Sequence, residues 1–208
     1  NLNYLLQGEA PDRLAILKQY LALRGFSFDE QETFIDCLLD WTDADSLRRT
    51  NGAEEEALYK PANRPITSLD EIPLVRGSAP LLRHPGWRDD LTLLSGGPLD
   101  LESAPAELIA LIPGIGEMRA DAFVRKRQGQ DGVDGTDDDH IFQDMNEVVA
   151  TLGLSQDQFS ALSGYVSFRD PIVRIRSVGT AGNIRRVVDV VARKVQGGNA
   201  QILLWTEK

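Results

Sequence analysis

Ile-Val-Arg-Ile-Arg-Ser-Val, at residues 172–178, opens the stretch of sequence that decides the fold class. Residues 184–195 follow with many valines that alternate with arginine, and residues 200–205 form another apolar run. The Gln-Gly-Gly-Asn segment at 196–199, between the last two runs, has the residue types of a tight loop. β-Branched runs joined by a glycine-containing loop predict a β-hairpin. A helix over 187–193 is the alternative, because short valine runs occur in both structures.

The chain between about residue 11 and residue 165 instead carries the signals of short helices. Pro11 suits a first helical position, and Leu14, Leu17 and Leu21 fall on one face of a helix. Gly25 then provides a residue that can end this helix. Much of the chain is therefore predicted to be helical.

Four sites carry a capping-box pattern, in which Ser or Asp is followed three residues later by Glu or Gln. Each pattern precedes a short apolar run and so predicts the start of a helix. The segments 68–77 and 144–153 also resemble each other, which predicts two related helical modules. The four pairs are Asp29 with Glu32, Ser68 with Glu71, Asp144 with Glu147, and Ser155 with Gln158.

The first six residues, Asn-Leu-Asn-Tyr-Leu-Leu, alternate weakly between polar and apolar types. This pattern is compatible with a strand that pairs with the C-terminal hairpin. The helical middle would then be an insertion into one sheet. The predicted fold class is α+β, with residues 1–10 and 172–208 forming an antiparallel sheet, 11–97 a first helical module and 98–171 a second.

Composition and charge exclude several classes of protein. The 208 residues are 42% hydrophobic and 26% charged, as in an ordinary globular domain. A formal net charge of −10 argues against bulk attraction to nucleic acid or anionic lipid, and suits the binding of hard cations. The sequence contains no apolar stretch long enough to span a membrane and no signal-peptide pattern. The residues that begin at Asn1 have a pattern typical of the interior of a domain, which predicts that an upstream segment has been removed.

The single cysteine cannot form a disulfide within the chain. Cys37 falls on the apolar stripe of a predicted helix. We therefore expect a buried structural thiol.

The most specific local motif is Leu-Ile-Pro-Gly-Ile-Gly at residues 111–116, which lies between two predicted helices. Gly114 and Gly116 can adopt backbone angles that other residues avoid. In DNA-binding helix-hairpin-helix modules, such a turn points N–H groups at a phosphate, and Arg119 and Lys126 could add charge. The net charge favours the simpler interpretation, a turn that packs two helices. DNA binding, as in an extracellular competence receptor, is the alternative function.

A dense acidic run follows this motif. Five carboxylates, Asp131, Asp134, Asp137, Asp138 and Asp139, lie within a glycine-containing loop. Carboxylates spaced by small residues can wrap Ca²⁺, which takes six to eight oxygen ligands from flexible loops. The twelve-residue EF-hand pattern is absent. A solvated acidic loop is the alternative interpretation.

A second group of oxygen-bearing residues lies near the end of the helix predicted around residues 34–41. Asp43 and Asp45 could serve one ion, with Asn51 and Glu54 returning from the next turn. Alternatively, Asp40 or Asp43 ends the preceding helix and the glutamates begin another. Both interpretations remain open at the level of sequence.

Catalytic motifs are missing from the sequence. His84 and His140 have no cysteine or serine partner at a recognisable spacing. The sequence contains no nucleophile-elbow, Walker or zinc motif. We therefore expect that the chain is not an enzyme.

Several segments, in their order along the chain, resemble the K-type minor pseudopilin of type II secretion systems, the general secretion pathway protein K. The resemblance extends over nearly all of the sequence, and no single segment is diagnostic. It rests on Asn-Leu-Asn at 1–3, Asp-Trp-Thr-Asp-Ala-Asp at 40–45, Asn-Gly-Ala-Glu at 51–54, residues 64–77, residues 103–108, the strand at 172–179 and the C-terminal hairpin.

This resemblance implies a fold and a role. The fold would be a pilin-like antiparallel sheet with a large helical insertion of two helix-hairpin-helix or SAM-like modules. The protein would sit at the tip of the pseudopilus with the I-type and J-type minor pseudopilins and initiate assembly without enzymatic activity. Members of the family are periplasmic and anchored in the inner membrane by an N-terminal hydrophobic helix, which is missing here. They also bind Ca²⁺ in the helical insertion, which implies one or two ions in this chain.

Overall fold

The computed structural model describes residues 1–207, which divide into two compact units. The helical unit contains Asn1–Leu93 and Gly97–Phe168, and the sheet unit contains Leu94–Gly96 and the residues from Arg169 onward.

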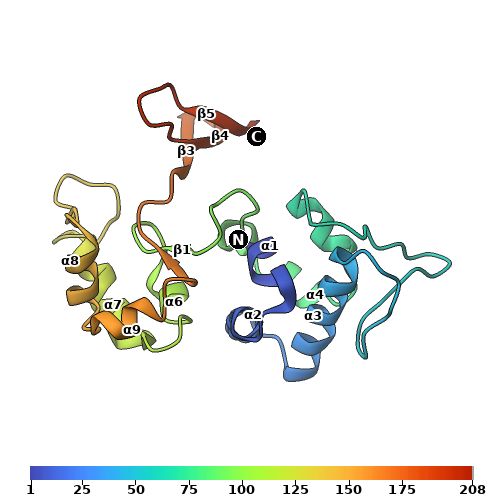
Figure 1. Ribbon diagram of the computed structural model, residues 1–208. Helices are drawn as coiled ribbons and strands as arrows, with labels where there is room; N and C mark the ends of the chain where they lie inside the picture. Colours follow the sequence, from blue (N-terminus) through green and yellow to red (C-terminus); the bar gives the residue numbers. More distant parts are fainter. Residues whose placement is uncertain (208) are drawn as a thin grey trace. The chain divides into compact units, whose positions relative to one another are not determined.

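The sheet unit is an antiparallel sheet in the order β3-β4-β5 (Figure 1). Its strands are β3 (Ile172–Ala181), β4 (Ile184–Arg193) and β5 (Gln201–Glu207). The predicted hairpin is therefore confirmed, and the helical alternative over 187–193 is wrong. Gly182, with φ of 56°, provides the turn between β3 and β4 that the sequence analysis did not identify.

The first residues form a helix, α1 (Leu2–Leu6), and the predicted N-terminal strand is wrong. The Asn1 side chain accepts a hydrogen bond from the Tyr4 N–H at 3.2 Å and caps this helix. Leu2 and Leu6, four residues apart, are both buried, so the weak polar–apolar pattern reflects a helical face. Residues 1–10 consequently belong to the helical unit and not to the sheet.

The N-terminal part of the helical unit consists of η1 (Gln7–Glu9), α2 (Pro11–Leu23) and α3 (Phe28–Thr42), of which α2 and α3 pack together. The predicted helix start at Pro11 is confirmed, and Gly25 follows α2 with φ of 84°. The capping box of α3 is formed by Ser27 and Glu30, so the predicted pair Asp29 and Glu32 is wrong. The serine precedes the helix and its hydroxyl accepts the Glu30 N–H, whereas Asp29 already lies in the first turn.

A loop leads from α3 to three short helices: η2 (Leu69–Leu74), α4 (Ala79–Leu82) and α5 (Trp87–Asp90). The predicted box of Ser68 and Glu71 opens η2 and is confirmed. One hydrophobic cluster joins these helices to α2 and α3, and Cys37 is buried within it as expected. Burial, with a smaller contribution from Asp40, raises the pKa of the Cys37 thiol to about 11.

A second hydrophobic cluster occupies the C-terminal part of the helical unit. At its centre, the rings of Phe123 and Phe142 stack with centroids 4.9 Å apart. The predicted caps Asp144 and Ser155 are confirmed, because each side chain accepts an N–H of the helix that follows it. The elements are β1 (Leu99–Asp100), α6 (Ala106–Ile109), α7 (Gly116–Arg127), α8 (Met145–Thr151), α9 (Gln156–Ser160) and β2 (Val166–Ser167), and β1 pairs with β2 in parallel.

The chain is thus a mixed protein of helices and an antiparallel sheet. Its division into modules at 11–97 and 98–171, and the naming of these modules, stay predictions. Within residues 1–207, none of the helices is long and apolar enough to cross a membrane.

Candidate metal centre

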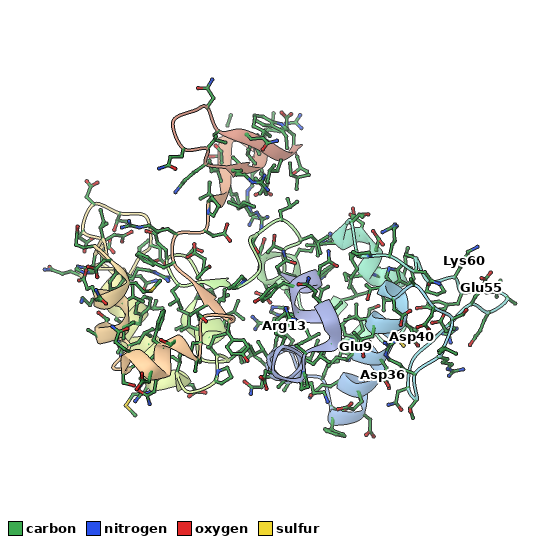
Figure 2. The ribbon with its side chains drawn as sticks, viewed as in Figure 1. Glu9, Arg13, Asp36, Asp40, Glu55 and Lys60 are labelled. Carbon is green, nitrogen blue, oxygen red and sulfur yellow. The ribbon has the colours of Figure 1, made fainter. Side chains whose placement is uncertain are left out.

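A group of carboxylates gathers where α3 ends and the following loop returns. Asp40 is completely buried in the last turns of α3, and Asp43 is the C-cap residue of that helix. Arg49, on the loop, donates from Nη1 to Asp40 Oδ1 at 2.6 Å and to Asp43 Oδ2, and from Nη2 to Glu9 Oε1 at 2.6 Å. Figure 2 shows Glu9 and Asp40 close together beside α3. One guanidinium therefore links two carboxylates at the end of α3 with one carboxylate of η1.

Glu54 is a buried carboxylate without a hydrogen-bond partner. Its residue is 8% exposed, and neither Oε1 nor Oε2 has a partner among the described residues. Asp43 Oδ1 is also buried and unpartnered. Burial raises the pKa of Glu54, and repulsion from Asp40, Asp43 and Asp45 raises it further. The centre thus has more negative charge than its own cation neutralises.

Close packing of the backbone fixes Asp40 in this centre. A Cβ atom on Gly52 would lie 1.9 Å from Asp40 Oδ2 and 2.7 Å from its Cγ. Only a residue without a side chain can bring the loop backbone so near to the carboxylate. From the sequence, Asp40 is expected only as a helix end. A carboxylate within an otherwise apolar helical stripe is the signal that could have identified it.

The structure brings together some of the predicted ligands and separates others. Asp43 and Glu54 belong to the centre, and Asp45 is near enough to affect Glu54. The Asn51 backbone N–H and side-chain amide both donate to Asp36 Oδ2, at 3.0 and 3.1 Å. Asn51 is therefore occupied on a different part of α3, and Asp40 is the residue that the prediction missed.

The chemistry of Asp43 and Glu54 suits a hard cation, because their unpartnered atoms are carboxylate oxygens. Asp40 and Asp43 are spaced so that both carboxylates bond to Arg49. Across residues 1–207, no group of three or more His, Cys, Asp or Glu side chains is arranged to hold a metal ion. In this structure the cation that neutralises Asp40 and Asp43 is therefore the Arg49 guanidinium.

The acidic run at 131–139 is held mainly by bonds within the chain. The buried Arg127 donates from Nε and Nη2 to the two oxygens of Asp134, at 2.8 and 3.0 Å. Its Nη1 donates to the carbonyl oxygens of Leu101 and Ala104, at 2.9 and 2.8 Å. Burial opposes ionisation of Asp134, but these hydrogen bonds lower its pKa. Asp134 is thus a structural ion-pair partner.

The remaining carboxylates of this run differ in how they are satisfied. Asp138 accepts the backbone N–H groups of Gln130 and Asp131, and Asp139 accepts that of Gly135 at 2.6 Å. Asp131 accepts the Val133 N–H at 2.8 Å, and Asp137 is exposed. These bonds give the loop its shape. The Thr136 hydroxyl, which donates to Asp138 Oδ1 at 2.8 Å, and the two backbone N–H groups hold the pKa of Asp138 below its usual value.

A cavity of about 340 Å³ lies beside this loop. Arg127, Asp134, Asp139, His140 and Phe142 are among the residues that line it. His140 Nε2 lies 2.6 Å from Glu147 Oε1, so its imidazole is engaged at the rim of the helix that follows. The other histidine, His84, lies 3.4 Å from Asp90 Oδ2.

The glycine turn before α7 has the backbone expected from the sequence. Gly114 and Gly116 have φ of 82° and 73°, and no atom outside their chain neighbours lies within 4 Å of a Cβ at either position. The two candidate phosphate-binding cations are engaged inside the protein: Arg119 donates to the Gly114 carbonyl at 2.8 Å, and Lys126 donates to Glu147 at 3.4 Å and Thr151 at 3.0 Å.

Comparison with known proteins adds a family and a fold. A family model described as type II secretion system (T2SS), protein K, matches residues 1–84. The structure is similar to a chain in the crystal structure of the GspK-GspI-GspJ complex from the type 2 secretion system of enterotoxigenic Escherichia coli. That similarity has a TM-score of 0.65 at 14% sequence identity and covers 100% of this chain and 75% of the other. No curated protein matches the sequence.

At 14% identity the solved structure is evidence about the fold alone, and the family model matches residues 1–84 of the 208. The residues matched by the family model include α1, α2 and α3 and the carboxylates Asp40 and Asp43. The chain thus matches the family model of type II secretion system protein K over residues 1–84, and its fold is similar to that of a chain in the GspK-GspI-GspJ complex.

Proposed function

We propose that this chain is the tip subunit of the pseudopilus, which caps the filament and initiates its assembly with the I-type and J-type minor pseudopilins. The observation that carries the proposal is the fold, which is shared over the whole chain with a structure determined as a GspK-GspI-GspJ complex. The protein acts through binding and has no catalytic role. In its full-length form it is periplasmic and is anchored in the inner membrane by an N-terminal hydrophobic helix.

The size of the helical unit supports a position at the end of a filament. It contains most of the chain, whereas the sheet unit has three strands and a short segment before Gly97. A helical unit that is so much larger than the sheet would obstruct the addition of another subunit above it, which suits a position at the end of the filament. In this proposal, α6, the glycine turn and α7 form a helix-hairpin-helix module that serves packing.

The test of assembly is reconstitution with the two partner types from the same secretion system. The chain and the soluble domains of the I-type and J-type pseudopilins are mixed with and without Ca²⁺ and separated by gel filtration. We expect a peak that contains all three chains in equal amounts. Three separate peaks under every Ca²⁺ condition would overturn the proposal.

We also propose that the helical unit binds Ca²⁺. The centre of Asp40, Asp43 and Glu54 is the first site, because both oxygens of Glu54 and Oδ1 of Asp43 are buried without partners, and the loop 131–139 is the second. A ligand that binds only the folded state raises the melting temperature by mass action. The melting temperature in millimolar CaCl₂ should therefore exceed that in EDTA, and equal values would count against both sites.

The DNA-binding alternative is separated from this proposal by a gel shift at low salt. Arg119 and Lys126 are engaged within the protein, and the net charge is −10. We therefore expect no retention of duplex DNA. Retention that is lost on replacing Gly114 and Gly116 would favour the alternative.

A further inference from the structure

The charges of this chain are separated between its two units. The sheet unit carries eight basic and three acidic side chains, all within residues 169–208, and so has a formal net charge of +5. The helical unit carries 14 basic and 29 acidic side chains, which give it a net charge of −15. The net charge of −10 therefore conceals a strongly basic unit, to which an anionic partner would be attracted.

One face of the sheet is apolar and exposed. Paired residues on neighbouring strands lie on the same face, because side chains alternate along each strand. Ile175 and Trp205 both pair with Val190, and they are 56% and 54% exposed. Ile202, which pairs with Ala192 in the next row, is 58% exposed. We call these five residues the apolar face.

The opposite face contains cations that are neutralised within the chain. The buried Asp189 accepts a hydrogen bond from Arg176 Nε at 2.8 Å and lies 3.4 Å from Arg174 Nη2. Asp189 pairs with Arg176 in the register, so this network lies on the side away from Trp205. An acid held between two arginines reduces their attraction for an anion outside the protein.

The ends of β4 carry cations that the chain does not neutralise. Arg186 pairs with Gly179 and lies on the same side as the apolar face, whereas Arg185 lies on the opposite side. Lys194 follows the other end of the strand. All three side chains are exposed, and none makes a hydrogen bond or an ion pair within residues 1–207. The apolar face is thus flanked by unpaired positive charge.

This combination matches the chemistry of an anionic bilayer surface. Lipid phosphates attract arginine and lysine, and tryptophan and aliphatic side chains favour the boundary between headgroups and acyl chains. The face is three strands and therefore about 10 Å wide, and a bilayer can adapt to it without a matching shape, as a folded protein could not. The acidic helical unit would be repelled by the same surface.

We infer that the apolar face, with the cations at the two ends of β4, binds the surface of an anionic phospholipid bilayer. The binding is peripheral: Arg186 and Lys194 contact phosphates, while Ile175, Ile202 and Trp205 enter the headgroup boundary. The inference does not depend on the role at the pseudopilus tip. In a membrane-anchored form, it would hold the sheet unit against the membrane and direct the helical unit away from it.

The test is co-sedimentation of the 208-residue chain with vesicles at low salt. Vesicles of phosphatidylglycerol and phosphatidylcholine in equal parts are compared with vesicles of phosphatidylcholine alone. We expect binding to the first kind only, and a loss of binding at high salt. Arg186→Gln should weaken the binding about fivefold. Arg185→Gln, which removes the same charge from the opposite face, should weaken it less than about twofold.

A second pair of variants tests the apolar contribution. Ile175→Ser and Val178→Ser change two half-exposed residues on opposite faces of β3, and only I175S should weaken vesicle binding. Trp205 provides a direct signal, because Trp41 and Trp87 are buried. Its fluorescence should shift to shorter wavelength when anionic vesicles are added. Circular dichroism melts establish that each variant is folded.

The outcomes separate this inference from the proposed assembly, which is tested without lipid. No binding of the folded chain to anionic vesicles at low salt would overturn the inference and leave the assembly intact. Equal weakening by R185Q and R186Q, without a shift in Trp205 fluorescence, would show diffuse attraction to the whole unit and would also overturn it. If R186Q and I175S abolish the complex with the I-type and J-type domains but leave vesicle binding unchanged, the face binds a protein instead.

Discussion

At the scale of single residues, the first carboxylate centre is built from an excess of buried negative charge. Within the described residues, the Glu54 oxygens accept no hydrogen bond of good geometry, and the Glu55 backbone N–H is only a minor influence on that carboxyl, whereas Asp40 has the Arg49 guanidinium and backbone N–H. The two acids therefore differ in what they require: one is satisfied by the chain, and the other is not. This difference leads to two predictions.

Replacement of Glu54 by Gln should stabilise the protein in EDTA and remove the stabilisation by Ca²⁺. The raised pKa of Glu54 means that the folded state holds the proton more tightly than the unfolded chain. The wild-type stability therefore declines as the pH rises above about 4.5 and levels off above the folded pKa. We expect the advantage of E54Q, about 1–3 kcal/mol at neutral pH, to vanish near pH 4 in thermal melts. An advantage that does not change with pH would show that repulsion at Glu54 is not its source.

Replacement of Gly52 by Ala should destabilise the fold because the added Cβ would overlap the Asp40 carboxylate. We expect a loss of about 1–3 kcal/mol in urea unfolding. The control is Gly179→Ala in β3, where no atom outside its chain neighbours lies within 4 Å of the added carbon. In the Asp40→Ala background, G52A should cost much less, and a full cost there would contradict the proposed overlap.

At the scale of the element, the starts of helices explain both the successes and the errors of prediction. A cap depends on residues that are neighbours in sequence, so Ser68, Asp144 and Ser155 could be identified from their spacing. The same pattern at Asp29 was misleading, because the true cap at Ser27 also has its glutamate three residues later. Local patterns identified these helices but did not choose between overlapping registers.

The register of α3 gives a prediction with an internal control. Ser27→Ala removes the hydroxyl that accepts the Glu30 N–H and should cost about 1 kcal/mol. Asp29→Ala removes only a first-turn charge and should cost a few tenths of a kcal/mol. Chemical denaturation of the two variants measures the difference, and an equal or larger cost for D29A would contradict the assigned cap.

The cap of η2 should give the protein a specific sensitivity to acid. Burial opposes ionisation of Glu71, but donors from Thr67, Trp41 and Arg64 lower its pKa to about 2. A depressed folded pKa adds stability above about pH 4.5, and this stability is lost as the pH falls toward 2. Glu71→Gln should therefore cost up to roughly 3 kcal/mol at pH 7 and almost nothing near pH 2 in thermal melts. A constant cost across this range would rule out the charge as the source.

At the scale of the whole molecule, the chain passes between its two units near residues 94–97 and again at 168–169. Within the sheet unit, the buried Asp170 bonds to both of the segments that enter it. Its Oδ2 accepts the Gly96 N–H and its Oδ1 accepts the Ile172 N–H, each at 2.8 Å. This carboxylate ties the short segment 94–96 to the start of β3.

Asp170→Ala should release that segment without unfolding the helices. We expect faster cleavage between residues 93 and 98 in limited proteolysis followed by mass spectrometry, with an unchanged melting temperature for the helical signal in circular dichroism. Unchanged cleavage would show that other contacts hold the segment.

The limits of prediction also follow from scale. Local sequence was enough for the three-stranded C-terminal sheet and most helices, because strand runs, turn glycines and caps act within a few residues. The N-terminal strand was predicted wrongly because residues 1–6 are too short to show a period, and the Asn3 side chain instead bonds the backbone of Ile66. The centre at Asp40 was half predicted, since Arg49 and Glu9 join it from separate segments. Their meeting depends on the packing of the loop onto α3, which no local pattern contains.

The tight approach of Gly52 to Asp40 has a consequence for how this protein can evolve. The two positions lie on different elements, yet a side chain at residue 52 and a full-length carboxylate at residue 40 cannot coexist. Which residues are tolerated at position 52 therefore depends on the residue at position 40, and the reverse. Relatives with a residue larger than glycine at position 52 should lack the acid at position 40. A change at this pair would mark lineages that gave up the centre altogether.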